Sequence, residues 1–282
     1  LHRNASVQIE NSYAAMAGGG MKVDSLDTFA DARLEIVNAT SKGSGGGIMV
    51  ANAVQIRPNA TIVVRDTVSG SAGGSIHVGA LLLSENGTLQ VSNGSAPASF
   101  GGCIFAGTVE SNATLLAVSD CNAGSAGGGL YVKQSLSVNG VLRTTRTRAA
   151  VTGSSVFVSG GDTRVASLEM NTVLGPGAAV AVTAENIVRL DSVELIGAEG
   201  AMFELVTNPG GEVMVESLNV VVNEKFRKSA ASRVSAGSHS ISMVCDCGEA
   251  WHGGCLAATE ETDEGAEIRC TSCPLPRSNN RT

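Results

Sequence analysis

The sequence predicts an all-β fold, a single-stranded, right-handed parallel β-helix of about 8–9 coils with about 22–28 residues in each. Composition is the first observation, because 35 of the 282 residues are Gly and 43% are hydrophobic, whereas only 3% are aromatic. The second is a repeat of about 26 residues that carries short apolar strands in phase. The aliphatic content argues against disorder, and Gly falls far below the one third that collagen needs.

Each repeat opens with a Gly-rich turn and an apolar–x–apolar strand. Gly occupies such turns because it reaches positive φ without steric strain. The turn is Gly45–Gly47 in one copy and Gly127–Gly129 in another. The residues that open the strands are spaced by 24 to 28 positions, and they are Met21, Ile48, Ile76, Ile104, Leu130, Val156 and Val180.

Two further strands with period-two alternation complete each unit. One lies before the Gly-rich turn, as at Leu34/Ile36 and Leu89/Val91, and the other follows the first strand, as at Val54/Ile56. Such a unit cannot bury its apolar residues alone, so we expect the units to stack into one aliphatic column. A β-sandwich is the alternative fold, and it would show irregular strand spacing instead of units in phase.

Asn and Asp recur at two positions of the repeat. Both residues tolerate the left-handed region and bond to the neighbouring backbone, and stacked copies can bond to one another. We therefore predict turn ladders from two sets of residues. The first set is Asn11, Asn38, Asp66, Asn93 and Asp120, and the second is Asn59, Asn86, Asn112 and Asn139.

The Gly-Gly-x-aliphatic cores at 46–48, 74–76, 102–104 and 128–130, each with an upstream Asn or Asp, resemble the repeats of polymorphic outer membrane proteins. This resemblance covers about residues 1–160. It implies a right-handed β-helix in an extracellular, adhesin-like protein that is not an enzyme. Beyond it the apolar alternation continues, and we expect a β-helix over 1–222, a linker or irregular coil over 223–243 and a Cys-rich segment over 244–282.

The Cys-rich segment allows three interpretations. Its Cys-x-x-Cys-Pro end resembles ephrin-receptor-like or EGF-like repeats, which implies disulfides among Cys245, Cys247, Cys255, Cys270 and Cys273. Because five is an odd number, one partner would lie elsewhere in the β-helix or beyond Thr282. Zinc bound by these cysteines and His252 is the second interpretation, and free thiols are the third. We predict no bound cofactor.

Net charge, hydropathy and sequence motifs limit the classes of partner and the cellular locations that fit this sequence. A net charge of −7 argues against nucleic-acid binding, and no apolar run is long enough to span a bilayer. The chain begins at Leu1, so we expect it to belong to a larger polypeptide. Asn-x-Ser/Thr sequons agree with an extracellular or cell-surface location, and they give candidate N-glycosylation sites at Asn4, Asn38, Asn59, Asn86, Asn93, Asn112 and Asn280.

Three functions are consistent with these features. The leading expectation is a non-catalytic adhesin, stalk or interaction module, whose partner is a protein or glycan surface ligand. An outward column of aromatic residues, Phe105, Tyr131 and Phe157, is its candidate partner-binding stripe, although ordinary packing explains it as well. The alternatives are a carbohydrate-active β-helix enzyme, which needs a groove with at least two carboxylates, and an intracellular scaffold with a C-terminal zinc finger.

Overall fold

The computed structural model describes residues 1–198, 203–208 and 211–221 and four further strands towards the C-terminus. Those four strands are β19 (Ala231–Ala236), β20 (His239–Val244), β21 (Ala257–Thr262) and β22 (Gly265–Cys270). The described residues contain strands but no helix, and they form a parallel β-solenoid of about 8 turns. The predicted fold class is therefore confirmed.

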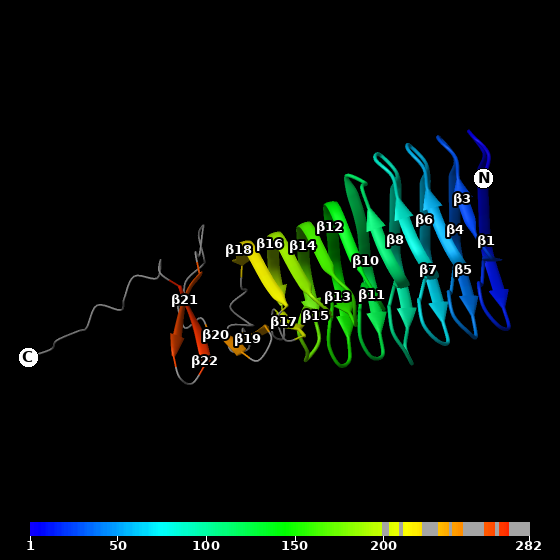
Figure 1. Ribbon diagram of the computed structural model, residues 1–282. Coiled ribbons are helices and arrows are strands. Elements are labelled where there is room, and N and C mark those ends of the chain that lie inside the picture. The colour runs from blue at the N-terminus through cyan, green and yellow to red at the C-terminus, as the bar shows by residue number, and fades with distance from the viewer. Residues whose placement is uncertain are drawn as a thin grey trace, which may run out of the picture.

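The coils stack side by side along one axis, and most strands belong to two series (Figure 1). One series contains β1 (Ser6–Ala14), β4 (Arg33–Ser41), β6 (Thr61–Ser69), β8 (Thr88–Ala96), β10 (Leu115–Ala123), β12 (Leu136–Ala149), β14 (Thr163–Leu174), β16 (Ile187–Ala198) and β18 (Glu212–Val221). The other contains β2 (Met21–Val23), β5 (Ile48–Ile56), β7 (Ile76–Leu83), β9 (Ile104–Ser111), β11 (Leu130–Val132), β13 (Val156–Val158), β15 (Val180–Ala184) and β17 (Phe203–Thr207). The short β3 (Leu26–Thr28) pairs with the second half of β5.

The predicted repeat sets the register of these strands. The first residues of the second series lie opposite one another on successive coils, from Met21 and Ile48 to Val180 and Phe203. Their side chains point inward, as do those of Leu34, Ile36 and Ile62, which are completely buried. The solenoid therefore has one continuous aliphatic core, in which each layer packs on the next at the inter-strand spacing of about 4.8 Å.

Strand boundaries differ from the prediction because the chain bends within strands as well as between them. Asp66 lies inside β6 with φ 58°, and the residues on either side of it keep their pairing with β4. A single residue in the left-handed conformation thus turns the strand without ending it. The first set of Asn and Asp residues marks this bend on successive coils.

The Gly-Gly turn is required by the close approach of neighbouring coils. Gly73 has φ 69°, a conformation that L side chains rarely adopt. At Gly74, a Cβ would overlap the carbonyl oxygen of Gly102 on the next coil and the backbone of Ser95. The first Gly therefore serves the turn, and the second gives space to the adjacent coil.

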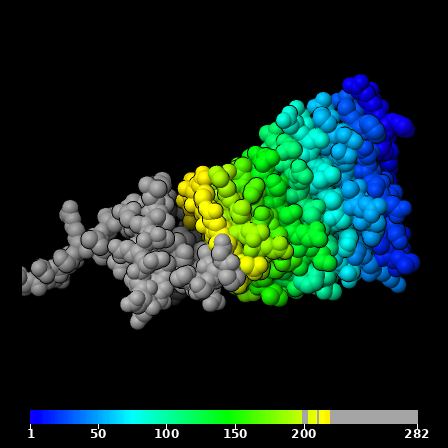
Figure 2. All heavy atoms as spheres, in the orientation of Figure 1, coloured from blue at the N-terminus to red at the C-terminus, as the bar shows by residue number. Residues whose placement is uncertain are grey.

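The solenoid narrows from its N-terminal to its C-terminal coils (Figure 2). From Ile76 to Ile104 one coil takes 28 residues, whereas from Val180 to Phe203 it takes 23. Much of the loss falls on one turn, which spans residues 57–60 between β5 and β6 but is absorbed into the continuous strand β12 three coils later and into β14 on the next coil. The early turns therefore project beyond the later coils along one edge.

Candidate functional site

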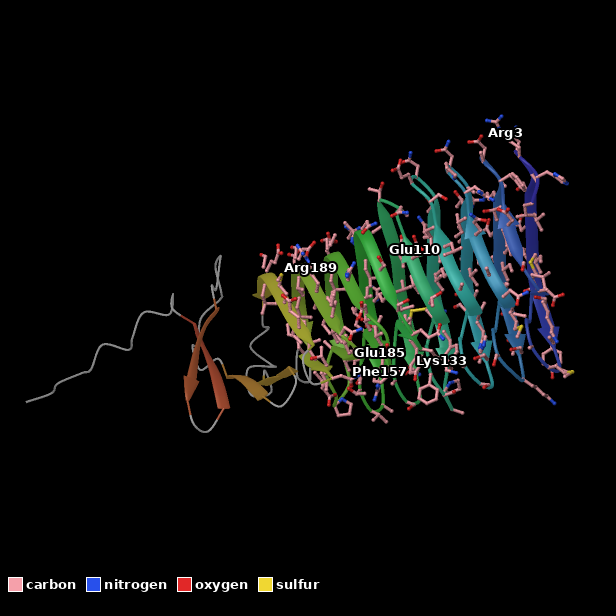
Figure 3. The ribbon with its side chains drawn as sticks, viewed as in Figure 1. Arg3, Glu110, Lys133, Phe157, Glu185 and Arg189 are labelled. Carbon is pink, nitrogen blue, oxygen red and sulfur yellow. A yellow bond between two sulfur atoms is a disulfide. The ribbon has the colours of Figure 1, made fainter. Side chains whose placement is uncertain are left out.

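Four rings form a stacked ladder on the outside of the solenoid. His77, Phe105, Tyr131 and Phe157 occupy equivalent positions of β7, β9, β11 and β13. Successive ring centroids are 4.6, 5.1 and 5.0 Å apart, with interplanar angles of 22°, 5° and 18°. The predicted outward column is thus a face-to-face stack of half-buried rings, here called the aromatic ladder. Phe157 and Lys133 lie along one edge of the solenoid, opposite Arg3 (Figure 3).

This stacking determines which part of each ring a partner can contact. The faces of Phe105 and Tyr131 are covered by their neighbours in the ladder, so only ring edges are open to solvent. Phe100 adds a tilted ring 4.8 Å from Tyr131, and the Lys133 ammonium lies 6.0 Å from the centroid of Phe105. Ring edges carry partial positive charge. The ladder therefore offers an apolar strip with a positive rim and little free ring face.

The C-terminal end of the ladder is closed by a small residue and a polar contact. Ala181 follows Phe157 in register and is only 2% exposed. On the next coil, Glu204 accepts a hydrogen bond of 3.2 Å from Thr152 Oγ1. At the other end, Met49 precedes His77 in register and is half-buried. The stack therefore comprises these four rings.

His77 is a titratable ring in the stack, and its pKa departs from the ordinary value of an imidazole. Burial against the coil lowers the pKa of the imidazole below 6.5, and the nearby charge of Lys133 acts in the same direction. The backbone of Ala72 opposes the shift. The neutral imidazole is therefore the form that the folded ladder favours.

The first predicted Asn/Asp set bonds from coil to coil along the bend. Asn38 Nδ2 donates to Asn11 Oδ1 at 2.7 Å, and Asn93 Nδ2 donates to Asp66 Oδ1 at 2.8 Å. All five residues of the set have positive φ. This arrangement satisfies polar side chains at the surface and stabilises the left-handed bend, so the set forms a structural ladder.

The bend persists after the Asn/Asp set ends. Arg146 takes the next position with φ 49°, and its guanidinium forms two hydrogen bonds, of 2.5 and 2.6 Å, with the Asp120 carboxylate. These bonds lower the pKa of Asp120 and outweigh the opposing effect of desolvation. Thr172 follows with φ 56°, which is unfavourable for a β-branched residue.

The second predicted set lies at the turn between the two strand series. Asn59 and Asn86 have positive φ, as do Asn4 and Asp31 at the same position of earlier coils. Asn139 Nδ2 donates to Asn112 Oδ1 at 2.6 Å. The sequon residues Asn4, Asn59, Asn86 and Asn112 are exposed along this edge, whereas the exposed amides of Asn38 and Asn93 donate to the bend ladder. Glycosylation stays a prediction, and Asn280 lies outside the described residues.

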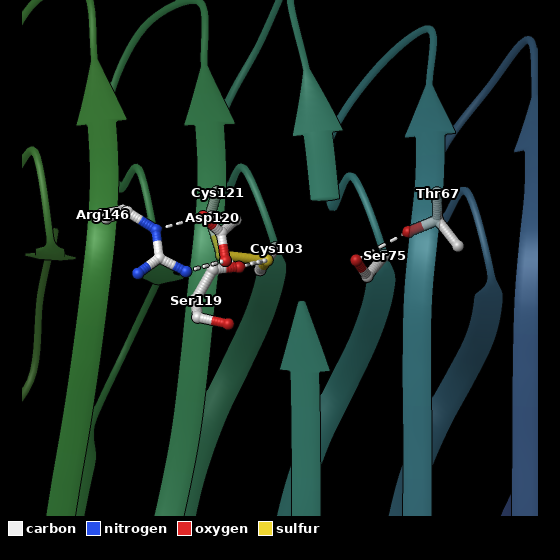
Figure 4. The surroundings of a disulfide bond; sticks show 7 residues. All are labelled: Thr67, Ser75, Cys103, Ser119, Asp120, Cys121 and Arg146. Atoms are coloured by element: carbon white, nitrogen blue, oxygen red, sulfur yellow. Dashed lines mark hydrogen bonds and ion pairs between the residues drawn. A yellow bond between two sulfur atoms is a disulfide. The ribbon is translucent and has the colours of Figure 1, made fainter. Parts of the chain in front are cut away.

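Sequence reasoning missed a disulfide inside the solenoid. Cys103 and Cys121, which belong to one coil and are 0% and 2% exposed, are bonded to each other (Figure 4). Ser75, one coil before Cys103, and Thr67, two coils before Cys121, occupy the same positions of the repeat and share a hydrogen bond of 2.7 Å. Gly94 lies between these pairs, and a Cβ there would be 2.8 Å from Cys103 Sγ. The signal in the sequence was the position of the two cysteines, one after a Gly-Gly pair and one after the bend residue.

The disulfide also bears on the C-terminal cysteines. Because Cys103 and Cys121 bond to each other, neither can pair with an odd cysteine of the tail. Cys245, Cys247, His252, Cys255 and Cys273 lie outside the described residues, and the side chain of Cys270 at the end of β22 is not described either. The disulfide, zinc and thiol interpretations of the tail therefore stay predictions. The described residues contain no group of three or more potential metal ligands.

A shallow groove lies where the turn between the strand series shortens. It encloses about 410 Å³ over β12, β14, β16 and β18. Its polar lining is Asn139, Arg164, Arg189, Asp191 and Glu212, and the rest is aliphatic or Met. Arg189 binds Asp191 at 2.6 Å and Glu216 at 2.7 Å, whereas Arg164 has no ion pair or hydrogen bond with any described residue. The groove therefore contains two carboxylates and one free cation, but no aromatic ring.

Comparison of this chain with protein-family models, with curated proteins and with solved structures finds no match. The resemblance to polymorphic outer membrane protein repeats therefore stays a prediction, while the β-solenoid stands on the geometry described above. None of the described residues belongs to a helix that is long and apolar enough to cross a membrane.

Proposed function

We propose that the chain is a non-catalytic extracellular or cell-surface β-helix that acts as a stalk, adhesin or interaction module. The aromatic ladder is the observation that carries this proposal. Its rings contribute stacking energy to the fold, but their edges, with Phe100 and Lys133, leave an apolar strip open on one edge of the solenoid. Exposed strips of this kind are typical of interaction surfaces.

The geometry of the ladder favours a protein partner. A sugar ring packs against the open face of an aromatic side chain, and stacking within the ladder covers both faces of Phe105 and Tyr131 and one face of Phe157. A protein surface can instead place aliphatic groups and carbonyl oxygens against the ring edges, which carry partial positive charge. The strip therefore suits a protein better than a glycan.

The buried disulfide supports an extracellular or cell-surface location. Disulfides persist in oxidising compartments and are rare where thiols are kept reduced. Cys103 and Cys121 are both buried in the solenoid core, so their bond serves stability and not surface redox chemistry. The same oxidising environment would favour disulfides in the C-terminal segment.

The test compares cell adhesion of beads coated with the full chain and with a variant that carries Phe105→Ser, Tyr131→Ser and Phe157→Ser. We expect the variant to fold and to lose most adhesion. A control variant, Val68→Ser with Val151→Ser and Ile196→Ser, removes exposed apolar residues outside the ladder and should adhere normally. Protease treatment of the cells should abolish adhesion and glycosidase treatment should not. Equal adhesion of all three proteins would refute the proposal.

The groove keeps a carbohydrate-active enzyme as the second candidate. Two carboxylates, Asp191 and Glu212, line it, as acid–base cleavage of a glycosidic bond would require. Asp191 is paired with Arg189 at 2.6 Å. Release of reducing ends from a panel of polysaccharides, lost in Asp191→Asn and Glu212→Gln, would establish this activity. Identical background release by all three proteins would exclude it.

A further inference from the structure

The groove on β12, β14, β16 and β18 has an origin in the fold that is independent of the aromatic ladder. Asn139 lies in β12 at an irregularity between Val138 and Val141, where the pairing with β14 shifts, and Ala166 lies at the same level of β14 on the following coil. Because Ala166 is small, a hollow remains between Asn139 on one coil and Asp191 on another. Figure 3 places Arg189 towards the edge opposite Phe157, so the groove and the ladder face different surroundings.

The charges in the groove leave one cation without a partner. Arg164 and Arg189 lie directly opposite each other in the register of β14 and β16, where like charges repel. Arg189 is compensated by Asp191 and Glu216. Arg164 is exposed and binds no described residue. An anionic group bound at Arg164 would complete the charge pairing of this arginine pair.

The other polar groups in the groove are mostly hydrogen-bond acceptors. Asp191 and Glu212 present carboxylate oxygens, and Asn139, which gives one Nδ2 hydrogen to Asn112, offers its Oδ1 as an acceptor and its second Nδ2 hydrogen as a donor. A ligand that fits must therefore combine one anionic group with several hydroxyl donors. The aliphatic lining from Ala166 and Ile187 suits the C–H face of a sugar ring.

We propose that this groove is a binding site for an acidic saccharide, with the sugar carboxylate on Arg164 and the hydroxyl groups on Asp191 and Glu212. A guanidinium binds a carboxylate through two parallel hydrogen bonds, which a neutral sugar cannot reproduce. Inorganic anions lack the hydroxyl donors and meet the two carboxylates. The inference goes beyond the proposed interaction module and requires no catalysis.

The test is saturation-transfer NMR and calorimetric titration of the full chain with digalacturonic acid, with its neutral counterpart galactobiose and with sulfate. Because the groove is shallow and open, we expect a Kd on the order of 1 mM for the acidic disaccharide. Arg164→Ala should weaken binding about tenfold or more, since it removes a charged, bidentate contact. Ala166→Leu should abolish binding by filling the hollow.

Arg143→Ala is the matched control, because Arg143 pairs with Glu169 on a neighbouring face and does not line the groove. It should bind like the parent chain, and circular dichroism of all variants should be unchanged. Equal binding of galactobiose, equal binding of sulfate, unaltered affinity in Arg164→Ala, or no saturation transfer at millimolar ligand would each overturn the proposal. The adhesion assay tests the aromatic ladder and the titrations test the groove. A negative result in one experiment therefore leaves the other proposal standing.

Discussion

The N-terminal and C-terminal coils of the solenoid share one core but impose the same backbone on different residues. Up to Asp120 the bend residue is Asn or Asp, which tolerate positive φ, whereas later coils use Arg146 and Thr172 with φ of 49° and 56°. Similarly, the tight position filled by Gly74 is filled by Ser154 and Ala178 in later coils. Stacking on the previous coil therefore sets the conformation, and the residue type determines its cost.

The largest effect should come from the tight Gly position of the N-terminal coils. Gly74→Ala would place a Cβ against the Gly102 carbonyl oxygen and the Ser95 backbone, which cannot move without separating two coils. We expect a loss of about 3 kcal/mol or more in the free energy of unfolding, measured by urea denaturation. Ala178→Gly, at the equivalent later position, should cost only about 1 kcal/mol. Similar losses in both variants would show that the two regions do not differ here.

Removal of the disulfide tests whether the N-terminal coils owe their stability to a covalent link. The two cysteines are 18 residues apart, and a loop of this size contributes about 3 kcal/mol in the chain-entropy account. Cys103→Ser with Cys121→Ser should therefore lower the free energy of unfolding by about 3 kcal/mol. Earlier coils carry hydroxyl side chains at the same two positions, in Thr67 and Ser75, so little extra loss from packing is expected. An unchanged denaturation midpoint under oxidising conditions would contradict this.

A substitution at Thr172 should make the bend in the C-terminal coils as free of backbone strain as the bend in the N-terminal coils. Thr172→Asn replaces a β-branched residue at positive φ, and we expect a gain of about 1 kcal/mol in thermal or urea unfolding. The reciprocal change, Asn93→Thr, introduces the strain and removes the amide that donates to Asp66. It should cost more than Thr172→Asn gains. A destabilising Thr172→Asn would mean that the hydroxyl makes a more important contribution than the backbone strain.

The smallest effect concerns pH and the ladder. Burial lowers the pKa of His77 below its ordinary value of 6.5, so the unfolded chain takes up this proton first as the pH falls. The contribution of His77 to stability is thus complete above about pH 6.5 and declines below it, down to the lowered pKa of the folded state. His77→Phe keeps the stack and should remove this part of the pH dependence. The difference between the two stability–pH curves isolates the group, and parallel curves would argue against the shift.

Much of the fold followed from the sequence because each coil repeats the same contacts at a fixed spacing. Met21, Ile48 and Ile76 lie in register as their spacing predicted, and the column from His77 to Phe157 lies on the outside. Face-to-face stacking of the rings was not predictable, because it depends on side-chain torsions that the pattern does not fix. The consequence for the candidate site is substantial, since stacking covers the ring faces that a glycan would need.

The disulfide and the groove escaped prediction for a different reason. Cys103 and Cys121 meet across the interior of the solenoid, and this proximity depends on where the chain bends. The sequence pattern predicts the positions of these bends only approximately. The groove arises from the gradual loss of a turn, so it reflects a difference between coils while the repeat describes what they share. The disulfide and the groove therefore both lie where individual coils differ from the repeat, and the repeat alone could not predict them.

The closed coil at Cys103–Cys121 gives the solenoid a mechanical property. Each coil bonds only to its neighbours, so tension applied at the narrow end would peel the described coils away one after another and release their contour length. At the disulfide, the 18-residue span between the cysteines cannot extend, which withholds roughly 60 Å at about 3.4 Å per residue. In a stalk under load, this bond would keep the span from Cys103 to Cys121 closed, while the coils on either side of it could still unravel.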